Sequence, residues 1–275
     1  MIPSTPIGGI AGWRFMQRTV DSQMAAFKAT PVLDRELNYF KENISKITSA
    51  EELVKDFTLF KVALGAFGME DKVADKFFFK KLLEEGSENE GAFALKLTDT
   101  RFREMAEAFG FGNEGGAKVA ESDFAARITD AYQVQQFEKA VGEDNGSMRL
   151  ALNLEREIGK YANAEFPETV AWFQLMANPP LREVFETAFG LPKSIGTLDV
   201  DRQRALFQDA SARLFGSKSM DVFQDPENVD KLLQNFFARE QINNGPGQLT
   251  RGMGALTLMQ NAVAAAANFA QFNRL

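Results

Sequence analysis

The sequence contains no cysteine and no histidine among its 275 residues. Without thiols the chain forms no disulfide and has no cysteine nucleophile, and without imidazole it lacks the usual proton carrier near neutral pH. Ser-His triads and zinc sites built on sulfur or imidazole are excluded for the same reason. Only carboxylate, Lys, Arg, Tyr or Ser groups are left for any chemistry. Because the sequence also lacks the spacing of a calcium-binding loop and the known active-site motifs, it predicts no catalytic residue, no cofactor and no metal site.

An excess of positive charge is also missing, as is a long apolar run. Lys and Arg number 31 against 38 Asp and Glu, which gives a net charge of −7. Because this average charge repels phosphate backbones, we expect no nucleic-acid partner. The longest run of small apolar residues, Ala262–Ala267, is far shorter than the roughly 20 residues of a membrane-spanning helix, so we expect no membrane insertion. No secretory signal is visible, and we expect a cytoplasmic protein, with export without a cleaved signal as the alternative.

The most informative feature that is present is a pattern that occurs twice. Leu59–Met69 and Leu181–Leu191 align without a gap. Apolar residues at helical spacing, followed by Phe and Gly, predict a packed helix that ends in a left-handed glycine. The positions that carry the repeat are Val62, Ala66, Phe67 and Gly68 in the first copy and Val184, Ala188, Phe189 and Gly190 in the second.

Helical periodicity recurs along the rest of the chain, and no segment shows sustained strand alternation. We therefore expect an all-α, multi-helix protein built from two related helical units at residues 30–118 and 119–240, with helical extensions at both ends. Residues 1–29 are expected to form a flexible N-terminus and an amphipathic helix. The remaining segment, 241–275, is expected to be a Gly-rich linker and a C-terminal amphipathic helix.

Two local signals sharpen the prediction for the first unit. Ser49 and Glu52 have the spacing of a capping box, which predicts the start of the helix that leads into the first copy of the repeat. The charged segment from about Asp71 to Glu85 is predicted to be one helix, with Phe77 among its buried residues.

Three glycines match the spacing of a dinucleotide-binding fingerprint. Gly110, Gly112 and Gly115 have the pattern G-x-G-x-x-G, which binds pyrophosphate at a turn from a strand into a helix. Here the glycines follow a helical pattern instead of a strand, so they predict a loop and no cofactor.

The C-terminal segment carries a narrow seam of mostly small apolar residues. Such a seam suits close approach to another helix, so we expect this segment to bind a protein partner or to self-associate. A helix folded back onto the body of the protein is the alternative. The residues of the seam are Leu256, Met259, Val263, Ala266 and Ala270.

Several short segments acquire significance when they are taken together. They are Ile47–Leu53, Val62–Gly68, Met148–Leu152, Ala188–Pro192, and Phe223–Pro226 with Asp230–Leu232. Through them the chain resembles the bacterial helical family catalogued as domain of unknown function twelve-seventeen, over roughly Asp34 to Arg239. Members are often encoded among flagellar genes in alphaproteobacteria, and the family supplies no catalytic residue. Asn153 departs from the resemblance, because an aromatic residue is expected there.

Two hypotheses of function follow. The first is a non-enzymatic structural or protein-interaction role linked to the bacterial flagellum, based on the missing Cys and His, the missing active-site motifs and the resemblance. The alternative is an enzyme or small-ligand-binding protein that uses only carboxylate, Lys, Arg, Tyr or Ser groups.

The seam of the C-terminal segment generates a first testable prediction. Truncation after Gln241 is expected to leave the melting temperature of the body nearly unchanged and to abolish association with a partner or a second copy. Thermal melting and analytical ultracentrifugation measure the two effects. If truncation unfolds the body instead, the segment belongs to the core.

Overall fold

The protein is described by a computed structural model, which covers residues 3–163 and 168–244. Within these ranges the chain is α-helical with short 3-10 segments and contains no strand, which confirms the predicted all-α class. None of the described helices is both long enough and apolar enough to cross a bilayer. The predicted C-terminal helix lies outside the described residues. The α-helices are α1 (Gly9–Lys28), α2 (Pro31–Asn43), α3 (Ala50–Lys55), α4 (Phe57–Ala66), α5 (Lys76–Glu85), α6 (Thr100–Phe109), α7 (Phe124–Asp144), α8 (Gly146–Ala162), α9 (Glu168–Met176), α10 (Pro179–Phe189), α11 (Val200–Phe215) and α12 (Pro226–Asn244).

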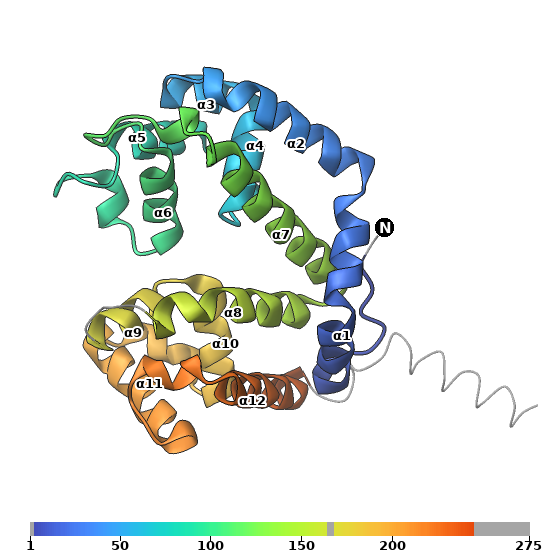
Figure 1. Ribbon diagram of the computed structural model, residues 1–275. Coiled ribbons are helices and arrows are strands. Elements are labelled where there is room, and N and C mark those ends of the chain that lie inside the picture. Colours follow the sequence, from blue (N-terminus) through green and yellow to red (C-terminus); the bar gives the residue numbers. More distant parts are fainter. Residues whose placement is uncertain (1–2, 164–167, 245–275) are drawn as a thin grey trace, which may run out of the picture.

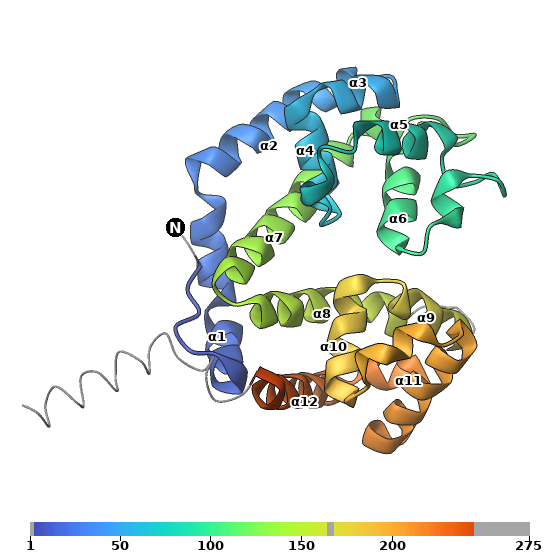
Figure 2. The same cartoon turned by 180° about the vertical axis from the view of Figure 1, so that it is seen from behind.

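The helices form two lobes that face each other (Figures 1 and 2). In the first lobe, helices α2 to α6 pack with the first half of α7 around one hydrophobic cluster, which contains Phe60, Phe109 and Tyr132. The second cluster contains Phe137 and Trp172, and it joins the rest of α7 to α1 and α8 to α12. The two cores therefore meet inside α7, between Tyr132 and Phe137. The predicted limits of the two units, 30–118 and 119–240, stay a prediction.

The two copies of the repeat form helices with the same ending. After α4, Gly68 has a φ of 68° and Met69 N–H donates to the carbonyl of Leu64 at 2.9 Å. After α10, Gly190 has a φ of 67° and the following N–H, of Leu191, donates to the corresponding carbonyl at 2.9 Å. Both endings are Schellman motifs, in which a left-handed glycine allows an orphan carbonyl to be satisfied.

The two helices also begin in the same way, at positions that lie before the repeat identified in the sequence. The carboxylate of Asp56 accepts a hydrogen bond from Leu59 N–H at 2.9 Å, and the side-chain oxygen of Asn178 accepts one from Leu181 N–H at 3.3 Å. Asp56 and Asn178 are thus N-caps at equivalent positions of the two copies. Whether the complete units are related in the same way stays a prediction.

Each of the repeated helices packs against other helices of its own lobe. Helix α4 packs against α2 and α7, and α10 packs against α8 and α12. The final Phe differs between the copies: Phe189 is buried among other aromatic rings, whereas Phe67 is half-buried beside Phe109. Phe189 therefore contributes more buried apolar surface than Phe67.

The capping box begins a different helix from the one predicted. Ser49 accepts from Glu52 N–H at 3.3 Å, as expected, but the helix stops at Lys55. The backbone of Asp56 is extended, and the carboxylate of Asp56 caps the start of α4. The hydroxyl of Tyr39 donates to the other carboxylate oxygen of Asp56 at 2.6 Å. The predicted continuous helix was wrong because a residue that caps the next helix interrupts this one.

The segment Asp71–Glu85 also differs from the prediction. A 3-10 turn at Glu70–Lys72 precedes α5, which begins only at Lys76. Phe77 is 90% exposed, and Phe79 on the same helix is fully buried. Three consecutive Phe residues cannot all face one core, since side chains rotate by about 100° per residue along a helix.

The Schellman endings generate the second prediction. Gly68→Ala and Gly190→Ala are each expected to lower the free energy of unfolding by about 1 kcal/mol or more, because alanine is strained at positive φ. At Gly190 the new Cβ would also displace the guanidinium of Arg239. Urea unfolding measures the loss. Gly115→Ala is the control, because Gly115 has open space around it and no positive φ. Equal effects in all three variants would contradict the role of the endings.

Candidate functional site

A cleft of about 1670 Å³ lies between the two lobes and is the main candidate site among the described residues. Its long walls come from α7 and α8, which follow each other in the chain and diverge from their junction at Asn145 (Figure 1). The end of α4, helix α6 and the start of α10 contribute at its other end. Both copies of the repeat therefore reach this cleft, one with the C-terminus of its helix and the other with the N-terminus.

Each long wall presents one face of its helix. The spacing of the lining residues is helical on both sides, so a single stripe of each helix faces the cleft. The stripe on α7 consists of Ala131, Gln135, Glu138 and Gly142, and the stripe on α8 contains Arg149, Asn153, Arg156, Glu157 and Lys160.

Arg156 is the centre of a buried ion cluster on these walls. Its guanidinium donates to both carboxylate oxygens of Glu138, with Nε–Oε1 at 2.7 Å and Nη2–Oε2 at 3.1 Å, and also to Glu157. The Glu138 side chain is only 3% exposed and the Glu157 side chain 7%. Lys160 Nζ lies 2.5 Å from the second oxygen of Glu157. Burial opposes the charge of Arg156, but the hydrogen bonds and charges of the two carboxylates outweigh burial and raise its pKa.

Glu104 faces the same cleft from α6 of the first lobe. Burial raises the pKa of Glu104. The positive charge of Lys160 opposes that rise, and the negative charge of Glu157 adds to it. Unlike Glu138, Glu104 forms no close ion pair with a described residue. It is therefore a desolvated carboxylate whose charge is only partly compensated.

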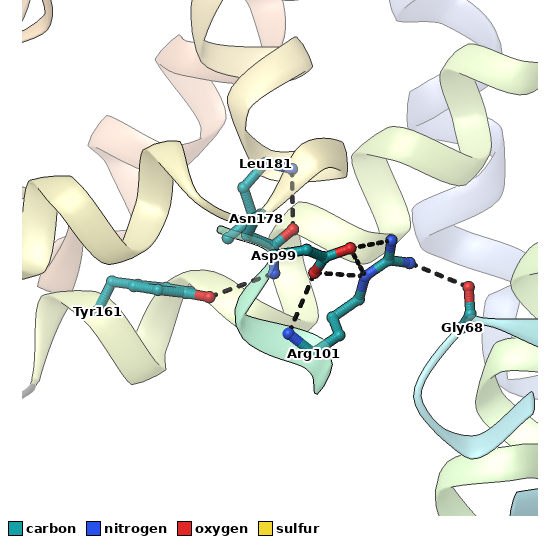
Figure 3. Close-up of polar contacts among 6 residues, drawn as sticks. All are labelled: Gly68, Asp99, Arg101, Tyr161, Asn178 and Leu181. Atoms are coloured by element: carbon teal, nitrogen blue, oxygen red, sulfur yellow. Dashed lines mark hydrogen bonds and ion pairs between the residues drawn. The ribbon is translucent and has the colours of Figure 1, made fainter. Parts of the chain in front are cut away.

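Two separate sets of polar contacts, one in each lobe, lie at one end of the cleft (Figure 3). The carboxylate of Asp99 caps α6 and pairs with the guanidinium of Arg101, whose Nη1 donates to the carbonyl of Gly68 at 3.0 Å. On the other side Asn178, which caps α10, donates to the hydroxyl of Tyr161 at 3.2 Å. The two lobes are joined here by a backbone hydrogen bond, in which Thr100 N–H donates to the Ala177 carbonyl at 3.4 Å. The glycine ending of the first repeat is thus linked to the lobe interface.

The residues singled out from the sequence are distributed between this site and the cores. Ala66, Phe67 and Gly68 line the cleft. The other positions of the repeat belong to the hydrophobic clusters or lie outside the cleft: Val62, Val184, Ala188, Phe189 and Gly190. Gly110 of the fingerprint is the left-handed C-cap of α6, so these glycines end a helix and do not join a strand to one. No group of three or more acidic side chains suited to a metal ion occurs within the described ranges.

The charged residues of the cleft were not predicted from the sequence, because a charged stripe on a helix is normally solvated. One signal did point here. Asn153, which stands where an aromatic residue is expected, is 9% exposed on the α8 wall. Its Oδ1 has no hydrogen-bond partner among the described residues. An amide in place of an apolar ring marks the wall of a polar site.

The ion cluster generates the third prediction. Arg156→Met is expected to destabilise the protein by about 3 kcal/mol, because it leaves Glu138 buried without its cation. Adding Glu138→Gln to this variant should restore part of the loss, as measured by urea unfolding in a double-mutant cycle. Arg127→Met, which removes a cation from exposed pairs with Glu121 and Asp123, is the control and should change stability by no more than about 1 kcal/mol. A similar small loss in both variants would contradict the cluster's role.

Glu104 generates the fourth prediction. The pKa of Glu104 is higher in the folded state than in the unfolded state. At a pH above both pKa values the ionised carboxylate therefore lowers the free energy of unfolding. This cost disappears at a pH below both values, where the carboxyl group is protonated in both states. Glu104→Gln is therefore expected to be more stable than the wild type at pH 7, with a difference that shrinks as the pH falls towards about 4. Thermal melting across this range measures the difference. Glu107→Gln, on the exposed side of the same helix, should show no comparable gain, and a pH-independent effect of Glu104→Gln would contradict the assignment.

Comparisons with known proteins place the chain in a family. No curated protein gives a significant match. The fold is similar to the crystal structure of protein AGR_C_984 from Agrobacterium tumefaciens, with 29% sequence identity and a TM-score of 0.70 over 88% of this chain and 99% of that chain. Residues 66–229 match the family described as "Protein of unknown function (DUF1217)". This match covers more than half of the chain and confirms the resemblance inferred from the short segments. The chain therefore belongs to the DUF1217 family.

Proposed function

We propose that this protein is a non-enzymatic protein-interaction protein that receives a segment of a partner in the interlobe cleft, and that it acts in the flagellar system of its host. The observation that carries the proposal is the ion cluster on the cleft walls. Glu138 and Glu157 are fixed and neutralised by Arg156 and Lys160, which suits a preformed recognition surface better than proton transfer. The size of the cleft and its walls of two long helices suit an extended or helical segment.

The flagellar part of the proposal rests on the family. Members of the family that the chain resembles are often encoded among flagellar genes, as described for the sequence. The absence of Cys and His removes many catalytic mechanisms and favours interaction over chemistry.

The test is a swimming assay of a deletion strain that is complemented with matched variants. Glu183 is exposed at the cleft, and Glu107 is exposed on α6 outside it. The deletion should impair swimming, and wild type and Glu107→Arg should restore it. Glu183→Arg, with the same change in charge, should fail to restore it while the purified variant melts like the wild type. Normal swimming of the deletion strain would contradict the flagellar role, and full rescue by Glu183→Arg would contradict the role of the cleft.

A second candidate is an enzyme or small-ligand-binding protein, with Glu104 as the proton-transferring group. It is favoured by the raised pKa of Glu104 and by the convergence of Glu104, Glu138 and Glu157 in one cleft. A thermal-shift screen with small polar metabolites tests it. The candidate requires a ligand that raises the melting temperature of the wild type and has no effect on Glu104→Gln.

A further inference from the structure

The charges that line the cleft are not balanced. Seven acidic side chains line it, against four basic ones. Most of the basic groups are already engaged within the protein. Arg101 is bound to Asp99 and to the carbonyl of Gly68, and Arg156 and Lys160 are bound in the ion cluster. Arg149, exposed near the α7–α8 junction, is the lining cation that forms no ion pair with a described residue.

The acceptors of the cleft are less well satisfied than its donors. Glu104 is desolvated and forms no close ion pair within the described ranges. Glu183 is exposed at the cleft and is likewise unpaired among the residues described. Asn153 is the independent observation: it is more than nine-tenths buried, and its Oδ1 lacks a donor in the described part of the chain. A buried acceptor left unsatisfied costs about 1–3 kcal/mol.

The geometry points to a cation site: we propose that the cleft binds an Arg- or Lys-bearing segment of a partner protein, with the partner's cation held between Glu104 on α6 and the Asn153 stripe of α8. This inference rests on the proposed function and specifies the chemistry of its partner. A cation placed there would pair with Glu104, which forms no close ion pair within the described ranges. It would also offer a donor to the Oδ1 of Asn153.

Arginine suits this place better than lysine. A guanidinium has five donors in a rigid fork, so one group can bond a carboxylate and an amide oxygen at the same time. The protein uses the same chemistry itself at Arg156, which bridges Glu138 on α7 and Glu157 on α8. A nucleic-acid segment does not fit, because its phosphates would meet an acidic cleft in a chain of net charge −7.

The experiment uses the full chain and a synthetic probe. The probe is a fluorescein-labelled, alanine-based peptide of about 15 residues, long enough to be partly helical, that carries three arginines. The matched probe carries citrulline, which is neutral, at the same three places. Fluorescence anisotropy should show that the wild type binds the arginine peptide at least about tenfold more tightly than the citrulline peptide.

Matched variants separate the site from the general acidity of the protein. Glu104→Gln should weaken binding of the arginine peptide at least about tenfold, whereas Glu107→Gln, with the same loss of charge on the same helix, should bind like the wild type. Equal weakening by both variants, or no preference for the arginine peptide, would overturn the proposal. Because Glu104→Gln is expected to fold more stably than the wild type, loss of binding cannot be attributed to unfolding.

Two further measurements exclude other occupants. Removing residues 245–275 should leave the affinity for the arginine peptide unchanged, and a gain of about tenfold or more would assign the site to the chain's own C-terminal segment instead. Sedimentation of the wild type and of Glu104→Gln should be the same, and self-association lost in the variant would assign the site to a second copy. If the protein does not bind the arginine peptide but swimming still depends on Glu183, this inference is wrong and the proposed function stands. If the protein binds the peptide specifically but the deletion strain swims normally, only the flagellar role is wrong.

Discussion

Charge buried in the angle between α7 and α8 is the constraint on which the rest of the structure depends. Two carboxylates on adjacent helices are largely removed from water, and Arg156 lies between them and pairs with both. This arrangement holds two polar helix faces towards each other. The same cluster therefore ties α7 to α8 and gives the cleft charged walls.

The features that could be predicted from the sequence are those decided by neighbouring residues. Gly68 and Gly190 end their helices as expected, because a left-handed turn depends on the glycine itself. Ser49 likewise accepts from Glu52 N–H, as the spacing of the capping box predicts. The prediction failed where one residue had two local roles, as at Asp56, or where several apolar neighbours competed for one core, as at Phe77.

The candidate site could not be predicted in the same way. Its charged residues lie on several helices, and each helix alone has an ordinary polar face. Glu104 approaches the α8 wall because the start of α6 is bonded to the second lobe, where Thr100 N–H donates to the Ala177 carbonyl. Asn153 was visible as a departure from an expected aromatic, but its meaning depends on a cleft that only the tertiary structure defines.

The shared helix α7 has a thermodynamic consequence for the whole molecule. Its first half contributes Tyr132 to one core and its second half contributes Phe137 to the other, so neither core can open without removing support from the same helix. Local unfolding of one lobe is therefore expected to expose part of the other, so the two lobes should open as one cooperative unit in hydrogen exchange. A ligand bound to either wall should then slow amide exchange in both lobes, including residues far from any contact with it.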